Sequence, residues 1–210
     1  MKVELVDSMG DDLRIANIAR VSFNKWKKEL GEKDASLINY LAAHEHSSPF
    51  RHTCISIRCK APIFIARQLG KHQVGLTWNE VSRRYVDADI EFFVPDSWRS
   101  RPDDGIKQGS GGEYKYQGAA NSDYEFLIKQ CLEIYESFIR QGVAPEQARM
   151  VLPQSMMTEW VWTGSLPAFF HVYRLRIDNH AQKEVRDFAK LLEEIVQPLF
   201  PVSWSALKGE

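Results

Sequence analysis

The sequence predicts an α+β fold in which residues 1–210 form one helix-rich domain with a small antiparallel sheet. Several segments repeat apolar residues at the spacing of a helix, whereas only a few alternate apolar and polar residues as strands do. We find no internal repeat or linker that would divide the chain, and 210 residues suit one core.

The first half of the chain alternates helix and strand patterns. Apolar residues at helical spacing occur behind an acidic start, and they occur again after Ser36, which suits an N-cap. The run TCISIRCKAP alternates β-branched and polar residues up to Pro62. We therefore expect helices at 11–23 and 36–44, a strand at 53–62, a helix at 63–72 and a strand at 91–95.

The second half opens with residues 101–121, which are too rich in Gly, Ser and charge to offset their ordering entropy by burial. They predict a mobile loop or lid. The strongest helix follows at 122–142, where a wide apolar stripe indicates a core helix that ends at Gly142. Beyond it we expect a short helix at 144–153, a strand at 158–165 and helices at 166–176 and 180–200.

Composition excludes several classes of protein. The formal net charge is −1, so no global field attracts nucleic acid or lipid. The N-terminal stretch has no apolar h-region and no run is long enough to span a bilayer, so we expect a cytoplasmic protein. Cys54, Cys59 and Cys131 are odd in number and have no CxxC spacing, which indicates buried thiols rather than disulfides, zinc ligands or a nucleophile.

The segment RQLGKHQVGLTWNEVSRRY, residues 67–85, gathers charged and amide side chains. On a helix, Arg67 and Lys71 lie one turn apart, which also suits an ordinary basic helix end. The later part adds a carboxylate, a hydroxyl and two guanidinium groups within five residues. That set is suited to a phosphate and a hydrogen-bonding ring.

A second cluster is RLRIDNHAQ, residues 174–182. Continued helix would place Arg176 and His180 on one face and Asp178 and Gln182 on another. A solvated face with an Arg to Asp pair is the alternative, worth under about 1 kcal/mol. Because the preceding run FFHVYRL is apolar enough to be buried, we interpret Arg176 as a ligand-binding group.

A third cluster places His44, His46 and His52 close together in the sequence, which would suit a metal-activated hydrolase or simply a helix end and a polar turn. No HExxH motif accompanies it, so we assign no metal. Ser82 lacks the G-x-S-x-G context of a hydrolase nucleophile. The usual dinucleotide and P-loop signatures are also absent from the sequence.

Several of these motifs, in order from about residue 10 to the C-terminus, resemble those of the flavin-dependent thymidylate synthases. They are ARVSF, SSPFRH, KAPIFIARQ, the 67–85 segment, ARMVLP and LRIDNHAQKEV. The signature of that family is Arg-His-Arg, seven residues, then Ser. Here Lys71 and Gln73 replace the two arginines, and eight residues separate Gln73 from Ser82. Lys71 keeps the charge but loses the planar fork of arginine.

The resemblance implies a role for each matching residue. Arg176 would be the catalytic residue, against the uracil ring of dUMP. The groups that would bind dUMP are Gln68, Lys71, Glu80, Ser82, Arg83, Arg84, Arg149 and Arg176. Those that would bind FAD are Ser22, His52, Lys71, His72, Gln73, Glu80, Ser165, His171 and His180.

The resemblance further implies the fold of that family, a homotetramer with active sites at subunit interfaces, and reductive methylation of dUMP to dTMP. In that reaction 5,10-methylenetetrahydrofolate would supply the carbon and NADPH would reduce FAD. A guanidinium near N3 and O2 of uracil would raise the nucleophilicity of C5 without a protein nucleophile. The alternative is a non-catalytic nucleotide-binding relative, which the replacements at Lys71 and Gln73 leave open.

Overall fold

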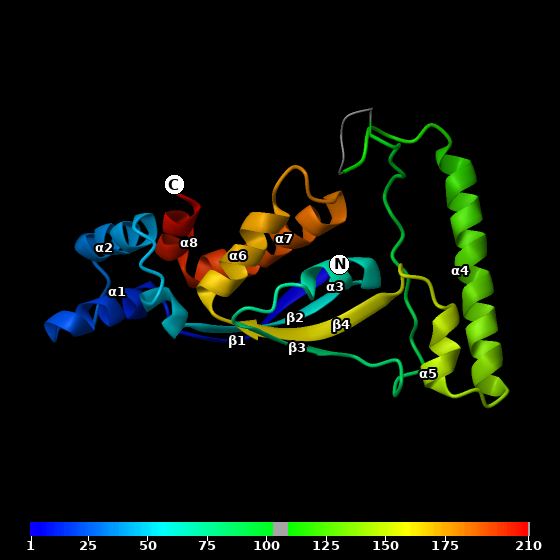
Figure 1. Ribbon diagram of the computed structural model, residues 1–210, viewed down its shortest axis with the longest axis horizontal. Coiled ribbons are helices and arrows are strands. Elements are labelled where there is room, and N and C mark those ends of the chain that lie inside the picture. The colour runs from blue at the N-terminus through cyan, green and yellow to red at the C-terminus, as the bar shows by residue number, and fades with distance from the viewer. Residues whose placement is uncertain (103–108, 210) are drawn as a thin grey trace.

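The computed structural model describes residues 1–102 and 109–209, and its centre is a four-stranded antiparallel sheet. The strands are β1 (Lys2–Met9), β2 (Cys54–Pro62), β3 (Leu76–Glu80) and β4 (Met157–Gly164), in the order β1-β2-β4-β3. Figure 1 shows this twisted sheet running along the middle of an elongated molecule. The expected strands at 53–62 and 158–165 are confirmed, whereas β1 and β3 were not predicted.

One face of the sheet carries the hydrophobic core. In β2, Ile55, Ile57, Cys59 and Ala61 are all fully buried, as expected for alternate residues of a strand that is covered on one side. The covering helices are α6 (Leu166–Arg176) and α7 (Lys183–Val196), which lie over the sheet in Figure 1. The core contains two fully buried tryptophans of β4, which contact Phe169 of α6 and Phe188 of α7.

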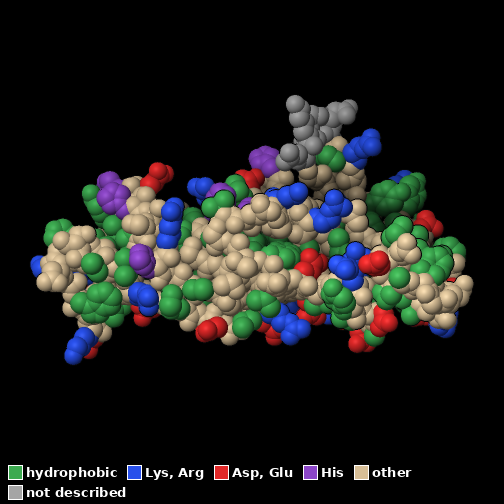
Figure 2. All heavy atoms as spheres, turned by 60° about the horizontal axis from the view of Figure 1, so that its bottom comes forward, with side chains coloured by type: hydrophobic (Ala, Val, Ile, Leu, Met, Phe, Trp, Pro, Cys, Tyr) green, Lys and Arg blue, Asp and Glu red, His purple; other side chains and the backbone are tan. Residues whose placement is uncertain are grey.

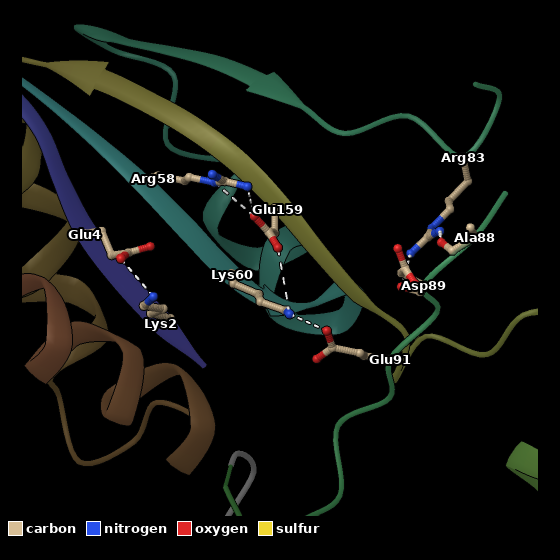
Figure 3. A network of polar contacts seen from close by, with 9 residues as sticks. All are labelled: Lys2, Glu4, Arg58, Lys60, Arg83, Ala88, Asp89, Glu91 and Glu159. Carbon is tan, nitrogen blue, oxygen red and sulfur yellow. Dashed lines mark hydrogen bonds and ion pairs between the residues drawn. The ribbon is translucent and has the colours of Figure 1, made fainter. Parts of the chain in front are cut away.

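The opposite face of the sheet is polar. Arg58 of β2 donates two hydrogen bonds to Glu159 of the neighbouring strand β4, and Lys60 lies between Glu159 and Glu91 (Figure 3). Alternating sign along neighbouring strands is a favourable cross-strand arrangement. The polar face explains why β2 alternates so clearly in the sequence.

Three helices close one end of the molecule: α1 (Asp12–Arg20), α2 (Glu32–Ala43) and α8 (Pro201–Lys208). The carboxylate of Asp12 accepts hydrogen bonds from the backbone N–H groups of Val202 and Ser203, so it caps α8 from the far end of the chain. We did not predict α8. We also placed the second N-cap wrongly, because α2 begins at Glu32 and Ser36 lies inside it.

The other end holds α4 (Gln117–Arg140) and the short α5 (Pro145–Ala148). The prediction of a core helix at 122–142 is wrong for this chain. Phe126 is 67% exposed and Leu127 is 50% exposed, and Tyr135 is the one side chain of α4 that is buried. The apolar stripe on α4 (Phe126, Leu127 and Ile134) therefore faces solvent in the single chain. Figure 2 shows hydrophobic side chains exposed at both ends of the molecule.

Two further expectations need correction. Residues 91–95 are not a strand, because they make only a single bridge, between Phe92 and Met156, although Phe93 also donates a backbone hydrogen bond to Ser155. The expected loop at 101–121 is helical from residue 117, and its residues 103–108 lie outside the described part of the chain. Among the described residues, none of the helices is both long and apolar enough to cross a membrane.

Candidate active site

A cavity of about 770 Å³ lies between α3 (Ile63–Leu69), the turn that follows it and β3. The turn and β3 supply most of the predicted flavin-binding groups that line it. The lining residues are Ile63, Ala66, Arg67, Gly70, Lys71, His72, Gln73, Leu76, Thr77, Trp78 and Glu80. The part of the 67–85 segment from Arg67 to Glu80 therefore contributes to the lining of a cavity.

Glycine at position 164 lets β3 approach β4 closely enough to form this wall. A Cβ at Gly164 would lie 2.5 Å from the carbonyl oxygen of Gly75 and 2.5 Å from the side chain of Leu76. Gly75 itself has φ of +72°, which L side chains rarely adopt, so the turn into β3 also requires glycine. Both glycines therefore allow the turn after α3 to lead into β3 at this close distance from β4.

The far wall of the cavity is aromatic and holds one oriented carboxylate. Trp78 stacks on Trp160 with ring centroids 4.2 Å apart. The two oxygens of Glu80 accept one hydrogen bond each, from the Trp78 indole N–H at 3.2 Å and from the Thr158 hydroxyl at 2.7 Å. Glu80 is therefore held in one orientation at the edge of the cavity.

Arg176 is the last residue of α6 and reaches back to the turn after α3. Its Nε donates to Nε2 of His72 at 2.9 Å, and a terminal nitrogen donates to the backbone carbonyl of Gln68 at 3.2 Å. A guanidinium has no acceptor, so Nε2 of His72 must carry a lone pair and the ring proton must sit on Nδ1. The contact fixes the tautomer of His72.

The surroundings keep His72 neutral. Burial, the nearby Arg176 charge and His171 together lower the pKa of His72 from 6.5 to about 4. The rings of His72 and His171 meet edge to face at 5.9 Å. Burial also lowers the pKa of Arg176. Within the described residues, no carboxylate lies at ion-pair distance from this half-buried guanidinium, so its charge is available to an anionic ligand.

Gln68 belongs to a different surface from the large cavity. It follows Arg67 by about 100° around α3 and does not line that cavity. Its side-chain nitrogen donates instead to Oε1 of Gln182 at 2.7 Å. Beyond Gln182 lies a smaller cavity of about 320 Å³, between Phe64 and Trp98.

The predicted phosphate-binding groups lie past the end of β3. Arg84 approaches Glu146 of α5 at 3.7 Å, and Nε of Arg149 donates to the backbone carbonyl of the same Glu146 at 3.2 Å. These two arginines therefore belong to one surface next to α5. The hydroxyl of Ser82 accepts from the backbone N–H of Arg84.

Arg83 has a structural contact in this chain. Its guanidinium donates to the backbone carbonyls of Ala88 and Asp89, as Figure 3 shows. These bonds close the loop that leads away from β3. The structure thus gives Arg83 a loop-bracing role, and a contact with dUMP at this residue stays a prediction.

The remaining predicted flavin-binding residues are dispersed. Ser22 and His52 lie in short 3-10 turns and are both exposed, and Ser165 is the N-cap of α6. His180 pairs with Asp178, because α6 ends at Arg176 and the continued helix that we expected is absent. Ser22, predicted to bind FAD, follows α1, whereas Arg149, predicted to bind dUMP, follows α5. The helices α1 and α5 lie at opposite ends of the molecule in Figure 1. One chain does not bring the whole predicted set together.

The histidine cluster has no metal-binding geometry. His44 stacks on Tyr40, and the rings of His44 and His46 are 6.3 Å apart. In the described ranges, no group of three or more His, Cys, Asp or Glu side chains is placed to hold a metal ion. The metal-hydrolase alternative therefore receives no support.

Three polar residues next to the site had no assigned role in the sequence reasoning: Gln182, Glu184 and Arg99. Gln182 was visible in the RLRIDNHAQ cluster, but its partner Gln68 lies 114 positions earlier in the chain. Arg99 was hidden in an irregular segment whose pairing with Glu184 spans 85 positions. No local pattern could have revealed either contact.

Comparison with known proteins identifies the family. The sequence model of the thymidylate synthase complementing protein family matches residues 4–202. A flavin-dependent thymidylate synthase of Thermus thermophilus is 37% identical over 98% of this chain and 75% of its own length. The chain belongs to the flavin-dependent thymidylate synthase family. The flavin-dependent thymidylate synthase of Treponema denticola is 40% identical over 98% of this chain and 78% of its own length.

A solved relative confirms the architecture of this family member. The crystal structure of the UMP/dUMP methylase PolB from Streptomyces cacaoi, bound with 5-Br dUMP, superimposes with a TM-score of 0.88. It is 30% identical in sequence, and the match covers 99% of this chain and 94% of PolB. The chain therefore has the fold of this relative even though Lys71 and Gln73 replace the two signature arginines and eight residues separate Gln73 from Ser82.

Proposed function

We propose that this member of the flavin-dependent thymidylate synthases converts dUMP to dTMP, with 5,10-methylenetetrahydrofolate as carbon donor and NADPH-reduced FAD as hydride donor. The observation that carries the proposal is the half-buried guanidinium of Arg176, which has no carboxylate partner in the described residues and is aimed by His72 and Gln68. A cation in this state is preorganised for a ligand that develops negative charge.

Arg176 would act on the uracil ring of dUMP. Negative charge would build on the ring as N3 loses its proton to water, and the guanidinium would stabilise that charge, which raises electron density at C5. Neutral His72 orients Arg176 without competing for the charge, since its Nε2 can only accept from the guanidinium. C5 of the ring would then attack the one-carbon unit of the folate.

The cysteines support a mechanism without a thiolate nucleophile. Cys59 is fully buried, and burial raises its pKa well above the ordinary value of a thiol. Cys54 and Cys131 are half-buried free thiols. Neither Cys54 nor Cys59 lines the cavity beside His72.

The donor set of the large cavity fits a flavin dinucleotide. Arg67, Lys71 and Gln73 offer donors for phosphate and ring oxygens, and Trp78 offers an aromatic wall. FAD supplies hydride chemistry when bound. Lys71 contributes a point charge where arginine would offer a fork, and Gln73 contributes an amide in place of a charge. We assign Ser22, His52, Glu80, Ser165, His171 and His180 to the same cofactor.

We further propose that the site is completed in a homotetramer. The predicted residues next to α1 and next to α5 lie at opposite ends of one chain, so neighbouring subunits would have to bring them together. The exposed apolar stripe on α4 supplies a surface that a subunit interface would bury. Native mass spectrometry of the purified protein tests the assembly, and a monomer at micromolar concentration would contradict it. The cytoplasmic location stays a prediction.

The activity itself is tested with purified protein, FAD, NADPH and 5,10-methylenetetrahydrofolate. We expect a yellow protein that forms dTMP from dUMP. UMP should be offered in parallel, because the structural relative PolB is a UMP/dUMP methylase. A protein that binds dUMP but forms no methylated product would support the non-catalytic alternative and would place the fault at Lys71 or Gln73.

A further inference from the structure

A chain of four polar side chains runs from an irregular segment to the surface that carries Gln68. A terminal nitrogen of Arg99 donates to Oε2 of Glu184 at 2.9 Å and lies 2.7 Å from Oε1 in the same ion pair. Glu184 also accepts from the side-chain nitrogen of Gln182 at 2.9 Å. Oε1 of Gln182 in turn accepts from the side-chain nitrogen of Gln68 at 2.7 Å. We call these four residues the amide relay.

The direction of every bond in the relay follows from chemistry. A guanidinium can only donate and an ionised carboxylate can only accept. Burial alone would raise the pKa of Glu184, but its hydrogen bonds from Arg99 and Gln182 lower it overall, so the carboxylate is ionised at neutral pH. The amide nitrogen of Gln182 must therefore face Glu184, and its oxygen must face Gln68.

The relay in this way fixes Gln68. The nitrogen of Gln68 is committed to Gln182, and the carbonyl oxygen of its amide points elsewhere, with no donor supplied by the described residues. The backbone carbonyl of the same residue binds Arg176. Gln68 is thus fixed on both sides, beside the guanidinium that we assign to the uracil ring.

We propose that Arg99, Glu184 and Gln182 are positioning residues that present the amide oxygen of Gln68 as an acceptor for a donor group on the nucleotide. The inference rests on the proposed function. The matching donors on dUMP are the N3–H of uracil and the 3′-hydroxyl of the sugar. Gln68 is itself a predicted dUMP-binding residue, and the new element is that three remote residues set which of its two polar atoms faces the ligand.

The ion pair between Arg99 and Glu184 is largely buried, so removing either charge would destabilise the protein. The side chain of Glu184 is 7% exposed and that of Arg99 is 23% exposed. A buried charge pair that loses one partner leaves the other uncompensated. A reversal that keeps the pair is the sharper perturbation, because it preserves the charges and changes only the direction of the hydrogen bonds.

Three variants separate the polarity of the relay from its bulk structural role. Gln182→Leu removes the middle of the relay. The double variant Arg99→Glu with Glu184→Arg keeps an ion pair but places a hydrogen-bond donor beside Gln182. The side-chain amides of Gln182 and Gln68 should then both rotate by half a turn, so that Gln68 presents its nitrogen to the nucleotide. Lys183→Met is the control, since Lys183 neighbours Gln182 but its ammonium pairs with Asp187, which is not part of the relay.

The experiment measures nucleotide binding by isothermal titration calorimetry on the flavin-loaded protein, together with the thermal midpoint of unfolding. We expect Gln182→Leu and the charge-reversed variant to bind dUMP about tenfold more weakly, which is the effect of one lost hydrogen bond in a binding site. Lys183→Met should bind dUMP as the wild type does.

Two analogues identify the donor that Gln68 reads. Wild-type protein should reject dCMP, which lacks the N3–H, if Gln68 contacts the base, and it should reject 2′,3′-dideoxy-UMP if Gln68 contacts the sugar. The charge-reversed variant should lose whichever discrimination the wild type shows.

If Gln182→Leu folds and binds dUMP with wild-type affinity, the relay proposal is wrong. The Gln182→Leu result alone tests the proposal if the charge-reversed double variant does not fold. Wild-type protein that binds no dUMP would overturn the proposed function as well, which distinguishes the two failures.

Discussion

Replacing Arg176 with methionine tests the part of the mechanism that rests most on geometry. Methionine keeps the apolar length of the side chain but removes the charge and both hydrogen bonds, to His72 at 2.9 Å and to the Gln68 carbonyl at 3.2 Å. Losing one preorganised donor to a developing negative charge lowers kcat by about 10² to 10³, or about 2.7 to 4 kcal/mol of transition-state stabilisation. We expect a loss of turnover of this size.

The fold should survive the change. The two acceptors left behind are only half-buried and can bind water, so each costs about 1 kcal/mol of stability or less. The pKa of His72 should rise from about 4, since the neighbouring positive charge is gone, but it should stay below 6.5 because burial, the largest cause of the shift, remains. The assay combines dTMP formation, flavin content and an NMR titration of the His72 ring.

Arg174→Met is the matched control for Arg176→Met. Arg174 lies in the same last turn of α6, is exposed, and contacts neither His72 nor Gln68. It should keep wild-type turnover and the wild-type pKa of His72. Turnover in Arg176→Met within about twofold of the wild type would refute the assignment of Arg176 to the transition state.

Three further outcomes follow from the site. The unfolding free energy should decrease as the pH is lowered from about 6.5 to about 4, because unfolded His72 takes up a proton in that range while folded His72 stays neutral. Urea denaturation at several pH values should show that His72→Gln removes this part of the pH dependence. Lys71→Arg should keep or improve dTMP formation, because it restores the planar fork, and complete loss would mean that the turn is arranged around lysine. Gly164→Ala should destabilise the protein by about 1 to 3 kcal/mol and reduce flavin content, since its Cβ would meet the Gly75 carbonyl; an unchanged thermal midpoint would contradict the close approach of β3.

The sequence predicted the elements whose patterns are local. Strand β2 was found from its alternation, which the buried side and the charged side of the sheet produce together. Helices α6 and α7 were found from their apolar spacing. Strand β3 was missed because its five residues, LTWNE, are too short and polar to show a period, and its pairing with β4 comes from tertiary contact.

The candidate site was only partly predictable for the same reason. The motifs located Arg176, His72 and Gln68 in the sequence, but not that the first donates to both of the others across more than a hundred positions. The continued helix that would have joined Arg176 to His180 fails because α6 ends at Arg176. The sequence correctly predicted an apolar stripe on α4 but wrongly placed it in the core. Helical periodicity predicts that one face of a helix is apolar, but it does not predict whether the same chain or another surface covers that face.

Formation of dTMP from dUMP by the purified protein tests the central claim most directly. With FAD, NADPH and 5,10-methylenetetrahydrofolate, liquid chromatography with mass detection should show a product 14 mass units (about one CH₂) heavier than dUMP, which Arg176→Met forms about 10² to 10³ times more slowly. Flavin-loaded protein that binds dUMP and yields no such product would contradict the account.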